Sequence, residues 1–247
     1  MSDASQWLLL DVGNTAIKWR LGDASALGGA SGAAATLDDL VAGLPAPSWC
    51  EVAISSVAGA PADAALTQAL QDLKAVPVWQ AESTAEFQGL VNSYATPQTM
   101  GVDRWLAMVA ARHGCAESLC VIDLGTAITV DLVSIDGHHQ GGFILPGPAL
   151  MQRALSADTG RIRVSAPPMP DLTPGKSTEA CVGAGVWRAA IGALTSCLAS
   201  YPEHRPVLTG GGAAAAIALG IEGEHRPDLV LEGLRLWLAQ QLDARES

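Results

Sequence analysis

Two short stretches of the chain place an acidic residue, a glycine and a hydroxyl residue directly after an apolar run. Residues 9–15 read LLDVGNT, and residues 121–126 read VIDLGT. An Asp at a strand end can hold a metal-bound water, and a glycine lets a phosphate approach the backbone. Either stretch alone is also compatible with an ordinary hairpin turn, because Asp and Gly are common turn residues. Two copies of the same arrangement favour a phosphate-binding function.

Each motif continues into a second β-branched run that predicts a returning hairpin strand. In the first copy, residues 7–12 predict a buried strand and residues 16–21 its antiparallel partner. Lys18 then lies near the turn, where its charge suits ATP phosphates, although a solvated strand lysine is equally compatible. The repeat predicts two related halves, residues 1–115 and 116–247.

The composition favours a compact globular enzyme or binding protein. Of the 247 residues, 49% are hydrophobic and 16% are charged, and the formal net charge is -11. This charge argues against a nucleic-acid partner, because such binding depends on Lys and Arg. We found no segment as long as a membrane span and no signal peptide, so we expect a cytoplasmic protein with no membrane partner.

The five cysteines show no CxxC pair and no Cys/His spacing suited to zinc, so we expect reduced core residues: Cys50, Cys115, Cys120, Cys181 and Cys197. The pair His138-His139 follows Asp136-Gly137, which favours an exposed hairpin turn over a metal site.

Strand, helix and strand patterns over residues 51–80 indicate a parallel crossover unit and hence an α/β fold. In the second half the patterns predict a strand and hairpin from 119, a rigid loop over 141–148, a helix over 149–155, a long connection over 159–174, an apolar helix from Thr178, a strand over 206–209 and an amphipathic helix over 229–242.

Two further glycine-containing segments carry weaker signals. Residues 175–177 (GKS) fail the P-loop pattern, because its first glycine would fall at Pro170 and no strand precedes it. Residues 210–212 (GGG) follow a predicted strand and could let a nucleotide lie against the backbone, but a plain tight turn is also compatible.

Residues 92–97 predict a loop, and Gly101-Val102-Asp103-Arg104 opens a helix that runs to about His113. An Asp near a helix start complements the helix dipole, which is a sufficient explanation for Asp103. Arg104 lies at the unfavourable end for a cation, so helix stability does not explain it.

The motifs 11–15, 101–104, 123–126 and 209–211, in this order, resemble those of the type III pantothenate kinases, which belong to the acetate and sugar kinase, Hsp70 and actin superfamily. The resemblance covers nearly the whole chain. Gly101–Arg104, together with the preceding Asn92-x-Tyr94-x-x-Pro97, narrows it from superfamily to family. The chain departs from the family in the Ala-rich segment after Gly212 and in the Pro-rich connection before Lys176.

The resemblance implies duplicated actin-like (ribonuclease H-like) domains, each a mixed five-stranded sheet flanked by helices, and a homodimer. It implies Asp103 as general base and Asp123 as ligand of a monovalent cation, K⁺ or NH₄⁺, with Mg²⁺ accompanying ATP. The implied ATP-binding residues are Asp11, Val12, Gly13, Asn14, Thr15, Ala16, Ile17, Lys18 and Thr126. The implied pantothenate-binding residues are Tyr94, Gly101, Val102, Asp103, Arg104 and Thr178.

The chemistry of the residues agrees with this implication, since phosphoryl transfer needs in-line positioning, charge neutralisation and a carboxylate that orients the attacking hydroxyl. We therefore expect ATP-dependent phosphorylation of pantothenate to 4'-phosphopantothenate, the first step of coenzyme A biosynthesis. Two alternatives remain. One is a nucleotide-binding regulatory protein of the same fold, acting on transcription, and the other is a phosphatase or ATPase of the same superfamily.

Overall fold

The computed structural model describes residues 6–158 and 167–246. The chain separates into two compact units, one of residues 1–113 with 228–247 and one of residues 114–227. Arg161, Arg163 and the start of the predicted connection lie outside the described residues. Each unit is described by itself below.

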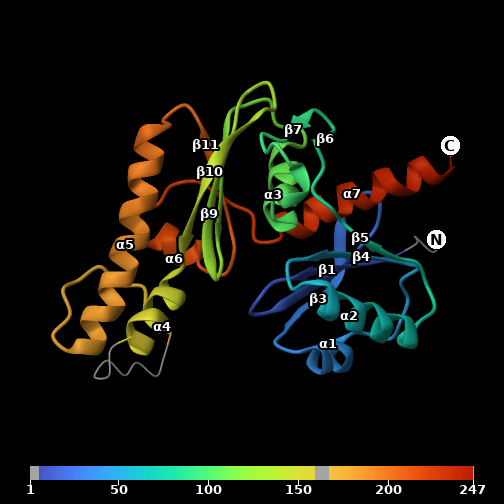
Figure 1. Cartoon of the computed structure of the whole chain (residues 1–247), viewed down its shortest axis with the longest axis horizontal. Coiled ribbons are helices and arrows are strands. Elements are labelled where there is room, and N and C mark those ends of the chain that lie inside the picture. The colour runs from blue at the N-terminus through green and yellow to red at the C-terminus, as the bar shows by residue number, and fades with distance from the viewer. Residues whose placement is uncertain (1–5, 159–166, 247) are drawn as a thin grey trace. The chain divides into compact units, whose positions relative to one another are not determined.

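The first unit is built on a five-stranded sheet with the strand order β3-β2-β1-β4-β5 (Figure 1). β1 pairs antiparallel with β2 and parallel with β4, so the sheet is mixed. The elements of this unit are β1 (Trp7–Val12), β2 (Ile17–Gly22), β3 (Leu27–Ala34), α1 (Leu37–Gly43), β4 (Glu51–Ser56), α2 (Ala60–Leu73), β5 (Val78–Gln80), β6 (Glu86–Phe87), β7 (Leu90–Val91), the 3-10 turn η1 (Pro97–Thr99), α3 (Val102–Arg112) and α7 (Leu229–Glu246).

Strand β1 is apolar along most of its length because both of its faces are covered. Leu8 and Leu10 share a core cluster with Leu40 of α1 and Leu66 of α2. Leu9, which points to the other face, is also fully buried, and α7 packs against β1 and β4. A strand buried on both faces reads as a continuous hydrophobic run.

The C-terminal helix α7 belongs to this first unit, whereas the predicted division placed it in the second half. Its residues Leu234 and Leu238 are fully buried, and the helix packs closely against α3. A Cβ atom at Gly233 would lie 2.0 Å from the carbonyl oxygen of Leu106, so only glycine permits this approach. The apolar face of α7 thus finds its partners in the first half of the sequence.

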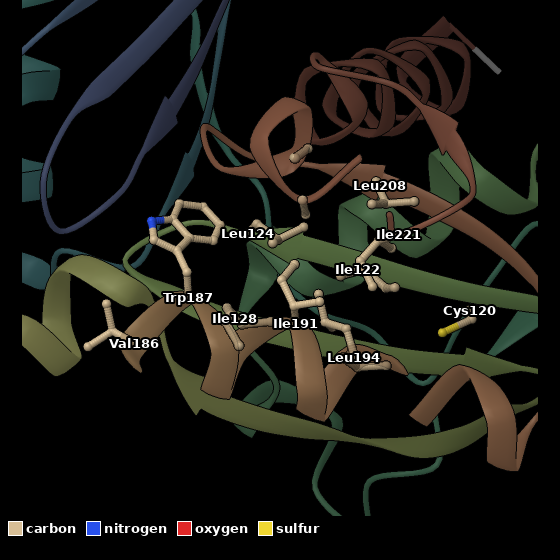
Figure 2. Packing of buried hydrophobic residues seen from close by; sticks show 14 of the residues in the cluster. Cys120, Ile122, Leu124, Ile128, Val186, Trp187, Ile191, Leu194, Leu208 and Ile221 are labelled. Atoms are coloured by element: carbon tan, nitrogen blue, oxygen red, sulfur yellow. The ribbon is translucent and has the colours of Figure 1, made fainter. Parts of the chain in front are cut away.

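The second unit repeats the same strand order, β10-β9-β8-β11-β12. Its elements are β8 (Leu119–Leu124), β9 (Ala127–Val133), β10 (His139–Pro146), α4 (Pro148–Asp158), α5 (Thr178–Ser200), β11 (Arg205–Thr209), α6 (Ala213–Ala218) and β12 (Glu224–His225). Figure 2 shows the core on one face of this sheet, where Ile122 and Leu208 pack with Ile191 and Leu194 of α5. The predicted duplicated α/β fold, with a mixed five-stranded sheet in each half, is confirmed.

The two acidic motifs occupy equivalent positions in the two sheets. Asp11 is the penultimate residue of β1 and lies opposite Ser55 of the parallel strand β4. Asp123 is the penultimate residue of β8 and lies opposite Thr209 of the parallel strand β11. The repeat recognised in the sequence therefore extends to a hydroxyl residue beside each carboxylate.

The prediction of a rigid loop over residues 141–148 is wrong for most of that segment, because it forms strand β10. This strand pairs antiparallel with β9 from His139 to Pro146. Its glycines and its proline suggested a loop. However, β10 is an edge strand, and glycine and proline are tolerated where one side of the ladder has no partner.

Helix α5 corrects the expectation that no segment approaches the length of a membrane span. It has 23 residues with a mean hydropathy of 1.4 over an 18-residue window, so length and composition alone would permit a span. Its residues Val182, Val186 and Leu194 are buried in the core of the second unit. A core helix of a globular unit passes the same test, so this helix is weak evidence for a membrane.

Candidate active site

The first acidic turn places a carboxylate and an ammonium group on one face of the sheet. Asp11 is half-buried, and the fully buried Ser55 hydroxyl donates to its Oδ1 at 3.5 Å. Lys18 lies directly opposite Asp11 on β2, so the two side chains share a face. The other residues predicted to bind ATP here are Val12, Gly13, Asn14, Thr15, Ala16 and Ile17, which form the end of β1, the turn and the start of β2.

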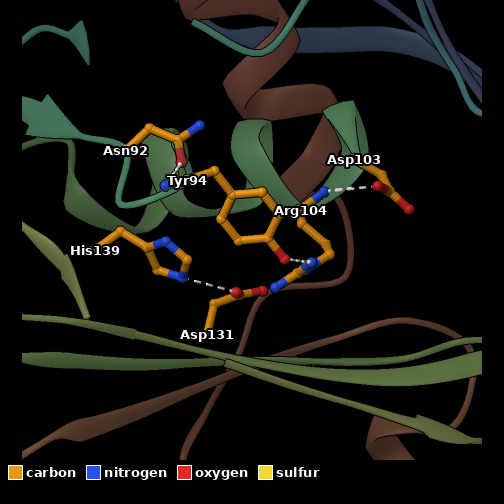
Figure 3. A network of polar contacts seen from close by, with 6 residues as sticks. All are labelled: Asn92, Tyr94, Asp103, Arg104, Asp131 and His139. Carbon is orange, nitrogen blue, oxygen red and sulfur yellow. Dashed lines mark hydrogen bonds and ion pairs between the residues drawn. The ribbon is translucent and has the colours of Figure 1, made fainter. Parts of the chain in front are cut away.

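Arg104 is a buried cation in the first turn of α3. Its side chain lies against Tyr94: Nη1 donates to the Tyr94 hydroxyl at 3.0 Å, and the guanidinium carbon is 5.8 Å from the ring centroid (Figure 3). The Asn92 Oδ1 accepts the backbone N–H of Tyr94 at 3.0 Å and so fixes the loop that carries the ring. Arg104 is only 7% exposed, although the N-terminal end of a helix disfavours a cation. This arrangement favours a role for Arg104 in binding an anionic group.

Asp103 directly precedes Arg104, and its carboxylate accepts a backbone hydrogen bond. Its Oδ1 accepts the backbone N–H of Arg104 at 2.8 Å (Figure 3). Gly101, the N-cap of α3, offers no side-chain cap, and a Cβ there would lie 2.6 Å from the same Oδ1. The absence of a side chain at Gly101 therefore leaves space for the Asp103 carboxylate in its observed position.

Asp123 lies in a cradle made by two glycines. A Cβ at Gly210 would lie 2.2 Å from the Asp123 Oδ1, and one at Gly125 would lie 3.4 Å from it. Gly210 has a φ of 86°, which favours glycine. The turn after β11 is held against β8, because Gly212 donates its N–H to the Leu124 carbonyl at 2.9 Å. The glycine run after β11 thus accommodates the backbone and carboxylate of the second acidic turn.

The chemistry of Asp123 can be compared with that of cation ligands. The Asp123 carboxylate is an oxygen donor of the kind that hard cations prefer. Within the described residues, no group of three or more His, Cys, Asp or Glu side chains that could hold a metal ion is found. An oxygen donor such as a carboxylate suits a hard cation.

The Thr126 turn continues into a groove between α4 and α5. Gly147 donates its N–H to the Thr126 carbonyl at 3.0 Å, and a Cβ at Gly147 would lie 2.6 Å from the Gly125 carbonyl oxygen. The neighbouring Pro146 lines a groove of about 1210 Å³ whose lining also includes Thr178, the exposed first residue of α5. The segment that follows the second acidic turn, at Pro146 and Gly147, therefore reaches the groove that Thr178 borders.

The structure distributes the predicted site residues over both units. Residues 11–18, Tyr94 and residues 101–104 belong to the first unit, and Asp123, Thr126 and Thr178 belong to the second.

The prediction of an exposed turn is wrong for His139. This residue is 3% exposed, and its Nε2 lies 3.0 Å from Oδ1 of Asp131, which is also buried (Figure 3). Its neighbour His138 does lie in the turn, with a side chain that is 59% exposed. The β10 strand begins at His139 and is irregular before Gly141, and the ring lies beside Asp131 of β9. The only sequence signal for this pair was an Asp within the apolar run of β9.

The cysteines are free thiols as predicted, but only Cys120 is fully buried. Burial raises the pKa of the Cys120 thiol to about 12, and the neighbouring Cys197 contributes. Cys181, at the start of α5, is exposed, so the prediction of core cysteines is wrong for this residue.

Comparison with known proteins identifies the family. The profile of the type III pantothenate kinase family matches residues 7–200. The type III pantothenate kinase of Hahella chejuensis is 37% identical over 234 residues, which cover 92% of this chain and 94% of that protein.

Two solved structures share the fold. A Campylobacter jejuni protein described as a Baf family transcriptional activator gives a TM-score of 0.62 at 20% identity and covers 96% of this chain and 99% of that one. The activator of 2-hydroxyisocaproyl-CoA dehydratase from Clostridium difficile, with bound ADPNP, gives a TM-score of 0.55 at 12% identity, covering 98% of this chain and 97% of that one. On the extent and identity of the sequence match, the chain belongs to the type III pantothenate kinase family.

Proposed function

We propose that this protein phosphorylates pantothenate to 4'-phosphopantothenate with ATP, the first step of coenzyme A biosynthesis. The observation that carries the proposal is the arrangement at the start of α3, where the Asp103 carboxylate adjoins the buried Arg104–Tyr94 pair. A kinase for a small alcohol needs a carboxylate to accept the hydroxyl proton and fixed donors to orient the acceptor. Both are present here, because Asp103 is adjacent in sequence to Arg104, whose side chain bonds to the Tyr94 hydroxyl.

Each residue of this cluster has a distinct role in the proposal. Asp103 is the general base for the primary hydroxyl of pantothenate. Arg104 provides a planar donor for the acceptor carboxylate, and its bond to the Tyr94 hydroxyl at 3.0 Å fixes the plane in advance. The backbone of Gly101 and Val102 adds further acceptor contacts. Thr178 of the second unit is proposed as an acceptor-binding residue on the family resemblance.

ATP binding falls to the two acidic turns. In the first, Lys18 neutralises phosphate charge, the turn between β1 and β2 lies against the phosphate oxygens, and Asp11 would hold the magnesium ion that accompanies ATP. In the second, the Thr126 hydroxyl donates to phosphate. Magnesium supplies charge neutralisation on the transferred phosphoryl group.

Asp123 binds a monovalent cation in this proposal, because its carboxylate lies in the glycine cradle at Gly210 and Gly125. Potassium and ammonium are the candidates. Replacing potassium with sodium or with a bulky organic cation should suppress turnover, and equal rates in all three would remove this role from Asp123.

A nucleotide-binding regulatory protein of the same fold is the alternative already raised by the sequence, and the Campylobacter jejuni structure is described as a transcriptional activator. That structure is 20% identical to this chain and supports the fold alone. A regulator would not need a base at Asp103 beside a buried Arg104. A phosphatase or ATPase would need a carboxylate that activates water, but not the Tyr94–Arg104 pair.

The decisive test is an acceptor assay. Purified protein with ATP, magnesium and potassium is given pantothenate, a panel of other small alcohols, or no acceptor. The proposal requires turnover with pantothenate that clearly exceeds the panel and the blank. Equal turnover in the blank would indicate an ATPase, and no turnover with retained ATP binding would favour the regulator.

We also infer a cytoplasmic homodimer. Helix α5 is apolar, but only a third of its 18-residue apolar window is buried within the protein. The remaining apolar surface could be covered by a second copy of the chain. Phe143 and Ile144 of the edge strand β10 are exposed as well. A monomer mass by light scattering at micromolar concentration would contradict the dimer.

A further inference from the structure

The residues that lead into α5 fold back along that helix, and we call residues 168–175 the strap. Three of its carbonyl groups accept hydrogen bonds from side chains of α5. Trp187 Nε1 donates to the Pro168 carbonyl at 3.0 Å, and Arg188 Nη2 donates to the Leu172 carbonyl at 2.9 Å. Nearer the helix start, the Cys181 thiol donates to the carbonyl of Gly175, at the end of the strap, at 3.3 Å.

The strap depends on these donors because of its composition. It contains Pro168, Pro170 and Pro174, which have no backbone N–H, so it cannot form a ladder of its own. A carbonyl group that is shielded from water needs a partner. The Pro168 carbonyl lies in a part-buried contact, and those of Leu172 and Gly175 lie in exposed ones. The side chains of α5 supply them.

Two of the donors, on Trp187 and Arg188, are polar groups on a largely apolar helix. Arg188 is the single cationic residue in the sequence of α5 and lies in the middle of this apolar helix. Its guanidinium group bonds to the strap. Trp187 is 6% exposed and belongs to the core of the second unit (Figure 2), so its indole N–H would be a buried unpaired donor without Pro168.

The strap ends in a close contact with the first turns of α5. A Cβ at Gly175 would lie 2.3 Å from the Cys181 backbone nitrogen, so only glycine fits. Two residues later Ser177 caps the helix, its hydroxyl accepting the Ala180 N–H at 3.2 Å, and Thr178 follows at the edge of the groove. The position of the chain at Gly175 thus sets how Thr178 enters the helix.

We propose that Arg188 and Trp187 are positioning residues for Thr178, acting through the strap that they hold against α5. The inference rests on the proposed acceptor contact of Thr178. Neither side chain touches the acceptor in this account. Loosening the strap should weaken acceptor binding and leave ATP binding unaffected.

The test compares Arg188→Met, Arg188→Lys and Trp187→Phe with the wild-type chain. Arg188→Met keeps the length of the side chain but removes the donor, and Trp187→Phe keeps a ring without the N–H. The KM for pantothenate should rise about threefold in Arg188→Met, with the KM for ATP unchanged, because an exposed hydrogen bond that acts through the strap contributes at the low end of the usual range. Arg188→Lys retains a donor and should recover part of the loss. Arg153→Met, an exposed arginine on α4, is the matched control.

An independent readout is the alkylation rate of the exposed Cys181 thiol, followed by peptide mass spectrometry. This thiol donates to Gly175, so a loosened strap should raise its rate several-fold, whereas buried Cys120 should stay unreactive in all variants. Unchanged alkylation, or equal increases in both KM values, would overturn the proposal. If the wild-type chain does not turn over pantothenate, the kinase proposal fails, while the alkylation rate still decides whether Arg188 seats the strap.

Discussion

Replacing Gly101 with Ala should strongly lower the activity and leave the protein folded. The new Cβ would lie 2.6 Å from the Asp103 Oδ1, well inside van der Waals contact, so the carboxylate must rotate away. The obstructed atom is the end of a side chain, so the structure can relax at little cost. Ala is a poorer N-cap than Gly, and we expect a loss of about 1 kcal/mol or less in unfolding free energy.

The catalytic cost should be much larger than the stability cost. Displacing a reacting group by about 1 Å can cost roughly 100-fold in rate, so kcat with pantothenate should fall by about that factor. The assay is steady-state pantothenate phosphorylation alongside thermal unfolding and ATP binding. Gly192→Ala is the control, because no atom lies within 4 Å of a Cβ there and Ala favours an exposed helix interior. A folded Gly101→Ala variant with near-normal kcat would refute the argued position of Asp103.

Three further substitutions test other parts of the account. Arg104→Lys removes a planar donor, so the KM for pantothenate should rise by about tenfold or more while ATP affinity measured by titration stays unchanged. Gly233→Ala places a Cβ 2.0 Å from the Leu106 carbonyl oxygen, a backbone atom that cannot move alone, and should lower the unfolding free energy by about 3 kcal/mol in chemical denaturation. Gly210→Ala intrudes on the Asp123 carboxylate and should raise the potassium concentration needed for half-maximal turnover; an unchanged requirement would place the cation elsewhere.

Most of the fold could be predicted because its signals are local. The core strands β1 and β8 are continuous apolar runs that end in the same acidic turn, which identified the repeat. The edge strand β10 could not be recognised, since its glycines and Pro146 are also typical loop residues and only its pairing with β9 distinguishes the two. The partner of α7 was equally hidden, because an amphipathic pattern shows that a face is buried but not against which element.

The residues of the candidate site could be predicted from the sequence, but the residues that pack around them could not. Asp103 and Arg104 were identified by their motif, and Arg104 also by its positive charge at the N-terminal end of a helix. Their surroundings depend on close approaches in three dimensions, such as Gly101 beside the Asp103 carboxylate. The burial of His139 against Asp131 likewise follows from strand register, which a two-residue histidine run beside a turn does not reveal.

The most direct test of the central claim is the turnover of Asp103→Asn with pantothenate and saturating ATP. Asn keeps the shape and the helix-start function of Asp103 but cannot accept the proton, so kcat should fall by roughly two to four orders of magnitude. ATP binding and the unfolding temperature should stay close to those of the wild-type chain. Near-normal turnover in a variant shown to be folded and to bind ATP would contradict the account, because Asp103 would then be a helix-start residue and not the base.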